Sequence, residues 1–272
     1  MFRDLEAANW ESVQCLLLMG LFNSAKLRVY DAWQVNHRAC CTVSILVPLQ
    51  RKLEAQHCQL FWIAYLQESQ ILAEYDFPAS GLGKLASSMP LPVVPAADTD
   101  PRHARYQLFF LGLISMRKLL NRILFHLYSR GQKDENELPH TDKPAAFLSV
   151  SPQVIYELDR QLEEWRTCLP QGLEFATFTE AQLSEIPLEQ HQRSTDEKLR
   201  GHLICRYFAA KSIIHRPYIY KALHHDLATP LSEVDSRGAR IAVGCALMVV
   251  IASGMLYEPL PLLLHPINSC RW

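Results

Sequence analysis

The stretch from Arg105 to Arg130, RYQLFFLGLISMRKLLNRILFHLYSR, predicts a long helix and decides the fold class. Its apolar residues recur at steps of three and four and form one stripe at about 3.6 residues per turn: Phe109, Leu113, Met116, Leu120, Ile123, Leu124 and Leu127. The opposite side carries Gln107, Lys118, Arg122 and His126. We expect the longest regular helix of the chain here, with other helices packed along it, because one wide apolar face is not stable alone in water.

Helical patterns on both sides of this stretch predict an all-α protein. Further helices are expected over residues 4–20, 25–47, 51–74, 152–169, 196–216 and 241–257. The expected breaks are the Gly20 to Ser24 stretch, Pro48, Pro170 and Pro217, the last of which kinks or ends its helix. With 10 glycines and no alternating apolar runs between turn residues, the sequence gives little sign of a sheet. We therefore predict a multi-helix bundle or a solenoid-like array.

Three segments between the helices predict long loops. The Pro-rich segment 76–103 is expected to drape over the bundle, although contact with a partner is an alternative, because it offers six apolar anchors: Phe77, Leu82, Leu85, Met89, Leu91 and Val93. A polar loop is expected at 130–150 and an acidic one at 170–195. The whole chain, 1–272, is expected to form a single helical domain. Because it stops on apolar residues just after a helix, we expect downstream helices to be missing.

Composition narrows the functional class. The net charge of -1 provides no global attraction for nucleic acid or an anionic membrane. The first residues, MFRDLEAANWESV, lack the apolar core of a secretory signal, so an intracellular protein is expected. The uncharged segment 241–257 is at the short limit for a membrane span, and a buried helix is the favoured interpretation. Eight cysteines without a C-x-x-C pair indicate buried thiols in a reducing compartment.

The usual enzyme motifs are missing from the sequence. It contains no Gly-rich dinucleotide fingerprint, no phosphate-binding loop and no G-x-S-x-G elbow. Two groups of metal-ligand type would meet if the second and third helices pack antiparallel, namely His37, Cys40 and Cys41 with His57 and Cys58. His202 and Cys205 lie one turn apart without a second pair. Buried cysteine is the favoured interpretation, so we predict no enzyme and no catalytic, cofactor or metal residue.

One basic and aromatic segment, 206–225, suggests two functions. RYFAAKSIIHRPYIYKALHH interleaves four cations with four aromatic residues: Arg206, Lys211, Arg216 and Lys221 with Tyr207, Phe208, Tyr218 and Tyr220. Such mixing can bind nucleic acid through phosphate contacts and stacking. The favoured interpretation is an amphipathic helix whose aromatic residues are core and whose cations are solvated.

Several stretches, in order along nearly the whole chain, resemble the fungal-specific transcription factor regulatory domain. They are AANWESVQCLLLMGLF (7–22), YDAWQVNHRA (30–39), QLFWIAYLQESQILAEYDFPASGL (59–82) with MPLP (89–92), LGLISMRKLLNRILFHLYS (111–129), ELDRQLEEWRTCLP (157–170), HRPYIYKALHH (215–225) and LLLHPINS (262–269). This family normally follows an N-terminal six-cysteine binuclear zinc cluster. The resemblance implies an all-α regulatory domain of a nuclear transcription regulator and supplies no catalytic residues.

The chain departs from that family at the zinc cluster. The cluster needs two C-x-x-C-x6-C halves, and the cysteines at 15, 40, 41, 58, 168, 205, 245 and 270 do not have this spacing. No direct DNA binding is therefore expected. No membrane is expected either, because the uncharged segments are short for a span. The implied partners are the transcription machinery or co-regulators, and a homodimer is left open. The alternative function is a helical small-molecule-binding protein or enzyme with a pocket between helices.

Overall fold

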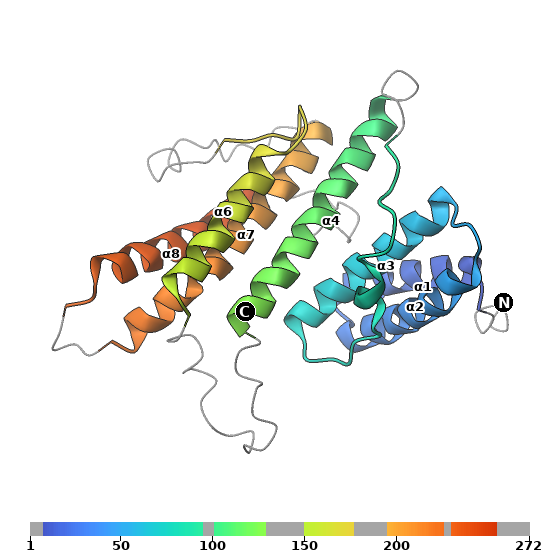
Figure 1. Ribbon diagram of the computed structural model, residues 1–272, viewed down its shortest axis with the longest axis horizontal. Coiled ribbons are helices and arrows are strands. Elements are labelled where there is room, and N and C mark those ends of the chain that lie inside the picture. Colours follow the sequence, from blue (N-terminus) through green and yellow to red (C-terminus); the bar gives the residue numbers. More distant parts are fainter. Residues whose placement is uncertain (1–7, 95–100, 129–149, 177–194, 226–229, 255–272) are drawn as a thin grey trace, which may run out of the picture. The chain divides into compact units, whose positions relative to one another are not determined.

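The computed structural model describes residues 8–94, 101–128, 150–176, 195–225 and 230–254, which form α-helices, one short 3-10 helix and no strand (Figure 1). In these ranges the all-α prediction is confirmed. The elements are α1 Trp10–Ala25, α2 Val29–Leu49, α3 Ala55–Glu74, η2 Leu82–Leu85, α4 Pro101–Tyr128, α6 Pro152–Thr167, α7 Thr195–Leu223 and α8 Glu233–Gly254. The polar loop expected at 130–150, most of the acidic loop at 170–195 and the segment 262–269 lie outside the described residues.

The chain forms two compact units that divide within α4, after Arg117. The first unit holds α1, α2, α3, η2 and the first part of α4. The second holds the rest of α4 with α6, α7 and α8. A single domain over residues 1–272 stays a prediction.

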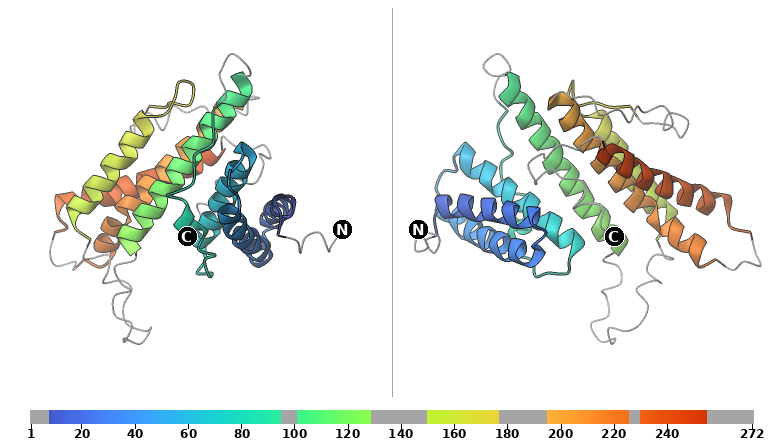
Figure 2. Two further views of the ribbon diagram at one scale, coloured as in Figure 1. Left: turned by 45° about the vertical axis from the view of Figure 1, so that its right-hand side comes forward. Right: turned by 180° about the vertical axis from the view of Figure 1, so that it is seen from behind.

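The core of the first unit lies where α1, α2 and α3 pack together (Figure 2). Its fully buried side chains include Val13 of α1, Val43 of α2, and Phe61 and Trp62 of α3. Ile114 of α4 belongs to the same cluster. The three helices are 16, 21 and 20 residues long and each buries one side, so they stabilise one another rather than folding alone.

Helix α1 begins six residues later than expected and runs through the predicted break at Gly20 to Ser24. Asn9 caps its start, because its side chain accepts a hydrogen bond from the Ser12 backbone N–H at 2.7 Å. Its end is a Schellman turn: the Arg28 N–H donates to the Asn23 carbonyl at 2.9 Å, and Leu27 takes the left-handed position with φ +57. The prediction of a break was wrong because Gly20 serves packing rather than chain termination.

Gly20 of α1 lies directly against Asn36 of α2. A Cβ atom at this position would lie 2.0 Å from Oδ1 of the buried Asn36. We expect Gly20→Ala to lower the free energy of unfolding by about 1 to 3 kcal/mol, although alanine is the better helix former. Urea denaturation measures this loss. Gly83→Ala, where nothing lies within 4 Å of the added atom, is the control and should leave stability nearly unchanged.

The buried face of α2 is turned by about one residue from the expected one. The sequence pattern marked Val29, Trp33, His37, Cys40 and Ser44 as one face. The buried residues of α2 are instead Ala32, Asn36, Ala39, Cys40 and Val43. Small side chains at two of these positions allow close packing of α1 and α2, whereas the bulky Trp33 lies at the rim, where its ring stacks on Phe77 at 5.0 Å.

Residues 76–94 drape over the first unit, as expected from their apolar anchors. Leu82 of η2 is fully buried, and Met89 is buried as well. The Trp62 Nε1–H donates to the Pro90 carbonyl at 2.8 Å, and Glu68 Oε1 accepts from the Ser80 N–H at 2.7 Å. The expectation was wrong for Leu91 and Val93, which are 55% and 74% exposed. Contacts to buried α3 side chains therefore fix this segment.

Helix α4 buries a wider face than its stripe predicts. The stripe residues are buried apart from Leu124, which is half-buried. Gln107, expected on the polar side, is also buried, and so is Arg117. The polar assignment of Gln107 was wrong, because its side chain is buried, with its Nε2 3.4 Å from the His103 Nε2 one turn earlier on α4. With 28 residues α4 is also shorter than α7, which has 29, so the expectation that it is the longest helix was wrong.

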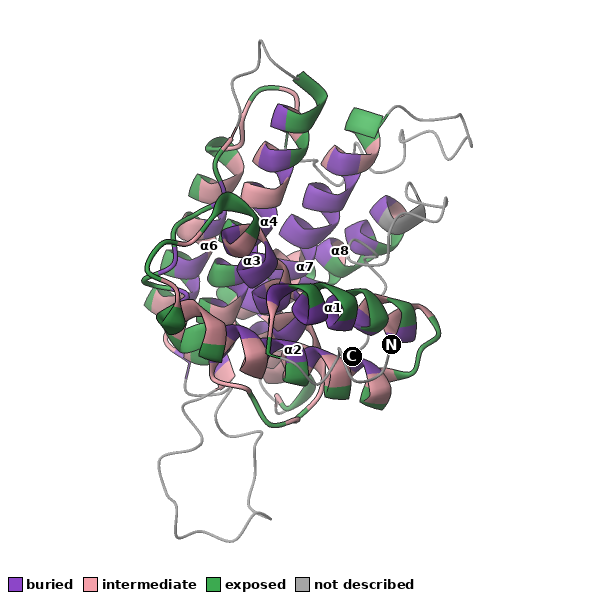
Figure 3. Cartoon of the chain, turned by 90° about the vertical axis from the view of Figure 1, so that its right-hand side faces the viewer, coloured by how far each residue is buried: buried purple, intermediate pink, exposed green. Residues whose placement is uncertain are grey.

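Helix α7 continues through Pro217, which was expected to kink or end it. The proline and its neighbours Ile213, Ile214 and Tyr218 are all buried, and α7 packs along both α6 and α8. In Figure 3 most of α7 has the colour of buried residues. Burial on this scale offsets the roughly 3 kcal/mol that a proline costs inside a helix. The chain after Pro217 is therefore not a separate short helix.

The two remaining helices of the second unit differ in how well their starts were predicted. The Ser151–Pro152 start of α6 is confirmed, since the Ser151 Oγ accepts from the Gln153 N–H at 3.3 Å. Helix α8 begins at Glu233, eight residues before the expected start, and Ser232 caps it. Its first two turns carry charges rather than an apolar pattern, which is why periodicity missed them. No helix among the described residues has the length and apolar composition that a bilayer crossing requires.

Candidate functional site

The most concentrated polar chemistry in the second unit lies between α6 and α7. Two carboxylates stand four residues apart on α6, Asp159 and Glu163. Three further groups stand four residues apart on α7: Tyr207, Lys211 and His215. Residues at this spacing share one helix face, so packing α6 on α7 brings the two rows together. We call these five residues the polar seam.

The members of the polar seam contact one another in a continuous row. The Tyr207 hydroxyl donates to Glu163 Oε2 at 2.7 Å, and Lys211 Nζ donates to the Tyr207 Oη at 3.2 Å. Asp159 Oδ1 lies 3.5 Å from Lys211 Nζ and 3.5 Å from His215 Nε2. These two last contacts are ion-pair distances rather than close hydrogen bonds. The row therefore begins with two hydrogen bonds at the Glu163 end and continues with two ion-pair distances at the Asp159 end.

One end of the polar seam is closed by Arg166. Its guanidinium contacts Glu163 Oε1 at 2.6 Å and donates to the Phe175 carbonyl at 2.7 Å. The Phe175 ring meets Tyr207 edge-on at 5.5 Å between ring centres. These contacts hold the segment after α6 against α7. The Tyr207 side chain is fully buried there.

Burial and charge shift the pKa values in the polar seam in opposite directions. Burial raises the pKa of Asp159, but the nearby His215 and Lys211 outweigh it, and the net shift is downward. The pKa of Glu163 is likewise lowered, because the Arg166 and Tyr207 hydrogen bonds outweigh burial. Burial, and then the bond to Glu163, raise the pKa of Tyr207. The carboxylates are thus held ionised and the phenol is held neutral.

We expect the polar seam to make the protein sensitive to acid. Unfolded carboxyls with ordinary pKa values of 3.8 and 4.5 bind protons at a higher pH than folded Asp159 and Glu163. The stability they contribute is therefore present above those values and is lost as the pH falls towards the lowered pKa values. Urea unfolding at a series of pH values should show this decline. Asp159→Asn should make it shallower, and an unchanged slope would contradict the ionised role of Asp159.

The chemistry available at the polar seam is that of a charge-paired helix interface. Cys245 of α8 is buried near the polar seam. Burial, with a smaller contribution from Asp159, raises the pKa of this thiol to about 11, although the charge of Lys211 opposes the shift. A neutral thiol is a weak nucleophile and a weak metal ligand. No three His, Cys, Asp or Glu side chains in the described residues come together in a way that would hold a metal ion.

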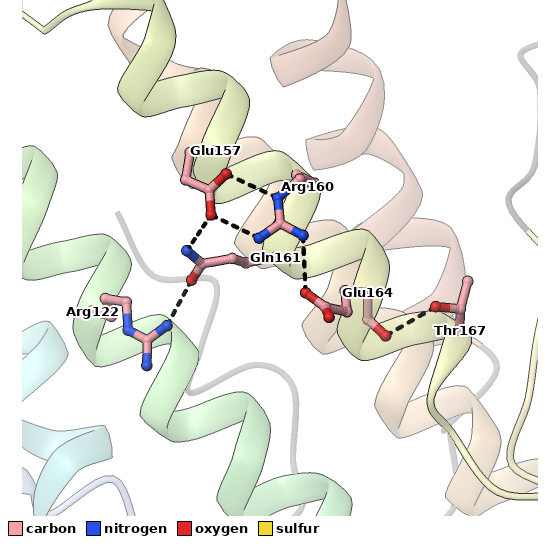
Figure 4. A network of polar contacts seen from close by, with 6 residues as sticks. All are labelled: Arg122, Glu157, Arg160, Gln161, Glu164 and Thr167. Atoms are coloured by element: carbon pink, nitrogen blue, oxygen red, sulfur yellow. Dashed lines mark hydrogen bonds and ion pairs between the residues drawn. The ribbon is translucent and has the colours of Figure 1, made fainter.

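A second polar network lies on the outer surface of α6 and reaches α4 (Figure 4). Gln161 accepts from Arg122 Nη1 at 2.7 Å and donates to Glu157 Oε1 at 2.8 Å. Arg160 bridges Glu157 and Glu164. These groups are exposed apart from Gln161, which is half-buried, so the network orients α6 on the second part of α4 but contributes little stability.

The metal-ligand types singled out in the first unit have other roles in the structure. The His57 ring stacks on Trp10 at 4.5 Å and its Nδ1 accepts from the Glu54 N–H at 3.3 Å, at the start of α3. The Cys40 thiol is fully buried and donates to the Ala64 carbonyl at 3.7 Å. The His37 ring lies 5.3 Å from Trp33. Cys58 is buried and Cys41 is half-buried, and burial raises the pKa of both.

The basic and aromatic segment 206–225 is largely turned inward. Tyr207, Phe208 and Tyr218 are buried, as the favoured interpretation predicted, whereas Tyr220 is only half-buried. His202 and Cys205, earlier on α7, are buried as well. The expectation that the cations are solvated was wrong. Arg206 is buried, Lys211 pairs with Asp159, Arg216 donates to the Tyr128 hydroxyl at 3.2 Å, and Lys221 lies 3.6 Å from Asp235. Cations engaged in this way do not form a phosphate track.

The polar seam as a unit was not predicted from the sequence. Tyr207 and Lys211 were recognised only as members of a basic and aromatic mixture, and no role was predicted for Asp159, Glu163 or His215. The available signal was the pair of titratable rows at four-residue spacing, one beside the apolar stripe of 152–169 and one within 196–216. That signal becomes specific only once α6 is known to pack on α7.

Two curated fungal proteins are similar to this chain. The uncharacterized transcriptional regulatory protein C530.08 of Schizosaccharomyces pombe is 22% identical over 246 residues, which cover 86% of this chain and 27% of that protein. The putative transcription factor ecdB of Aspergillus rugulosus is 24% identical over 259 residues, which cover 80% of this chain and 39% of that protein. The chain thus spans between about a quarter and two fifths of the length of these relatives. No protein-family model and no solved structure matches it.

Proposed function

We propose that this chain is a regulatory and effector region of a fungal transcription regulator, acting in the nucleus through contacts with other proteins. The observation that carries the proposal is the similarity of more than three quarters of the chain to two fungal proteins named as transcription regulators. The ordered segments that resemble the fungal-specific regulatory domain support the same function. So does the second unit, whose most concentrated titratable groups pair with one another at a helix interface.

The proposal also states that this chain does not recognise DNA by itself. The cysteines do not have the spacing of a binuclear zinc cluster. The four cations of segment 206–225 are buried or paired within the protein. We therefore expect no sequence-specific DNA affinity from this chain, and a separate DNA-binding element or a partner must bring it to its target genes.

A tethering experiment tests the regulatory function. The full chain is fused to an unrelated sequence-specific DNA-binding domain and expressed in yeast with a reporter gene that carries the matching sites. We expect the fusion to raise or lower reporter transcription several-fold. The same chain without the fused domain should leave the reporter unchanged, because it does not bind the sites by itself. The DNA-binding domain alone provides the baseline.

Folding and localisation must be controlled in this assay. A fluorescent tag reports nuclear entry, and a fusion carrying Leu120→Asp, which should not fold, is expected to return the reporter to baseline. A wild-type fusion that is folded and nuclear but leaves the reporter unchanged would contradict the proposal. Binding and turnover of a small molecule by the purified chain would favour the enzyme alternative instead.

A further inference from the structure

Helix α1 carries apolar residues on two opposite faces. Its inner face packs into the core of the first unit through Val13, Leu16 and Leu17. Its outer face is exposed along one side, as the colouring of α1 in Figure 3 shows. Three large residues of that face are 59%, 41% and 59% exposed, namely Leu18, Met19 and Phe22. Contiguous large apolar side chains exposed on one helix face often mark an interaction surface, so we expect a partner to cover this outer face.

The exposed residues form one continuous stripe with a charge at each end. Cys15, Leu18, Met19 and Phe22 follow the spacing i, i+3, i+4, i+7, and Cys15 is also exposed. Glu11 stands one turn before the stripe and Lys26 one turn after it. Lys26 Nζ lies 5.8 Å from the centre of the Phe22 ring, so this cation lies beside the end of the stripe. We call these residues the outer α1 stripe.

We propose that the outer α1 stripe is a self-association surface, covered by the same stripe of a second copy that runs antiparallel to it. A two-fold axis between Leu18 and Met19 places the apolar residues of the two copies against one another. The same axis places Glu11 beside Lys26 of the partner subunit, and it repeats this pair on the other side. The proposal concerns the first unit alone and does not rest on the proposed transcriptional function.

The end charges select a second copy in the antiparallel sense. The spacing i, i+3, i+4, i+7 is the same in both directions along the helix. Any apolar stripe with this spacing can therefore pair with a second copy of itself, and the spacing alone does not identify the partner. Opposite charges at the two ends make antiparallel pairing doubly favourable and parallel pairing doubly unfavourable. Helix α8 is a useful contrast: its exposed stripe of Val243, Ala246, Leu247 and Val250 is preceded by Arg240 and followed by Ser253, without an opposite charge. A bilayer surface would instead favour several cations along the flanks.

The expected dimer is weak. One helix face from each copy buries well below the about 800 Å² per partner of a standard interface, so we expect a dissociation constant of about 10 to 100 µM. Sedimentation equilibrium of the full chain over a concentration series that spans this range should show a monomer and dimer equilibrium. A single one-chain species throughout the series would overturn the proposal.

Two sets of variants locate the interface. Leu18→Glu with Phe22→Glu places charges in the centre of the stripe and should reduce association by more than about tenfold. Glu11→Lys turns both end pairs into repulsions and should weaken association by about fivefold, whereas the double variant Glu11→Lys with Lys26→Glu should restore it to near the wild-type level. Lys84→Glu, an exposed charge change on η2, is the control. Circular dichroism confirms that each variant keeps its helices, because the end charges also suit the helix dipole.

A zero-length carbodiimide cross-link reports the antiparallel sense directly. Glu11 and Lys26 of one chain are about 22 Å apart along the helix axis, so a cross-linked peptide joining them must come from two chains. We expect this peptide in the dimer of the wild-type protein and its loss in the variant with two glutamates in the stripe. A dimer that survives those glutamates, or one that lacks this cross-link, would overturn the proposal.

Discussion

Leu120→Asp in α4 is expected to prevent the second unit from folding. Leu120 is 6% exposed and lies on the buried stripe of this helix between Met116 and Ile123, both fully buried. An aspartate there replaces apolar packing with a charge, so folding must either bury that charge or protonate it. We expect the free energy of unfolding to fall by more than about 4 kcal/mol. This loss is a large part of the stability of an ordinary domain.

The measurement is helicity by circular dichroism together with urea denaturation of the full chain. The matched control is Phe125→Asp on the same helix, since Phe125 is 64% exposed and its ring meets the His126 ring edge-on. Its denaturation midpoint should stay near that of the wild type. Equal effects of the two substitutions would show that the stripe does not face the interior.

Lys211→Met is expected to have the second largest effect. The change removes the cation that contacts both Asp159 and the Tyr207 hydroxyl, and it leaves a carboxylate with 31% of its side chain exposed beside His215. We expect a loss of about 2 to 3 kcal/mol, below the roughly 3 to 5 kcal/mol of a fully buried pair because solvent reaches both partners.

A double-mutant cycle separates the ion pair from the loss of packing. Asp159→Asn combined with Lys211→Met removes both charges, and the double variant should regain about 1 kcal/mol relative to Lys211→Met alone. Arg160→Met, on the outer face of α6, removes an exposed cation with two carboxylate partners and should change stability little. Strict additivity of the two single substitutions would mean that Asp159 and Lys211 do not interact.

The helices were predictable from the sequence because apolar periodicity is a local signal. The apolar stripe of α4, apart from the half-buried Leu124, and the Ser151–Pro152 start of α6 both appear in the structure as expected. Local rules failed where packing decides. Gly20 reads as a helix breaker, yet it is the residue that lets α1 approach Asn36. Pro217 reads as a helix end, yet the buried residues around it keep α7 continuous.

The polar seam could not be predicted from the sequence for a related reason. Rows of charged residues at four-residue spacing usually mark a solvated helix face, and nothing local tells which faces of two helices meet. Tyr207 shows the difficulty: its ring and hydroxyl suit either base stacking or a buried hydrogen bond, and only the position of Glu163 decides. The early start of α8 was missed because its first turns are held by Ser232 rather than by an apolar stripe.

The bond from Trp62 to the Pro90 carbonyl gives the first unit an optical reporter of its own. The indole is fully buried and meets the Phe61 and Tyr65 rings edge-on, so its fluorescence should be blue-shifted and shielded from aqueous quenchers. Release of residues 76–94 would let water reach the indole N–H and shift the emission to the red, even with α3 still helical. In a variant that keeps Trp62 as the single one of the five tryptophans, emission reports attachment of this segment separately from loss of helix, and stopped-flow mixing can time the two events.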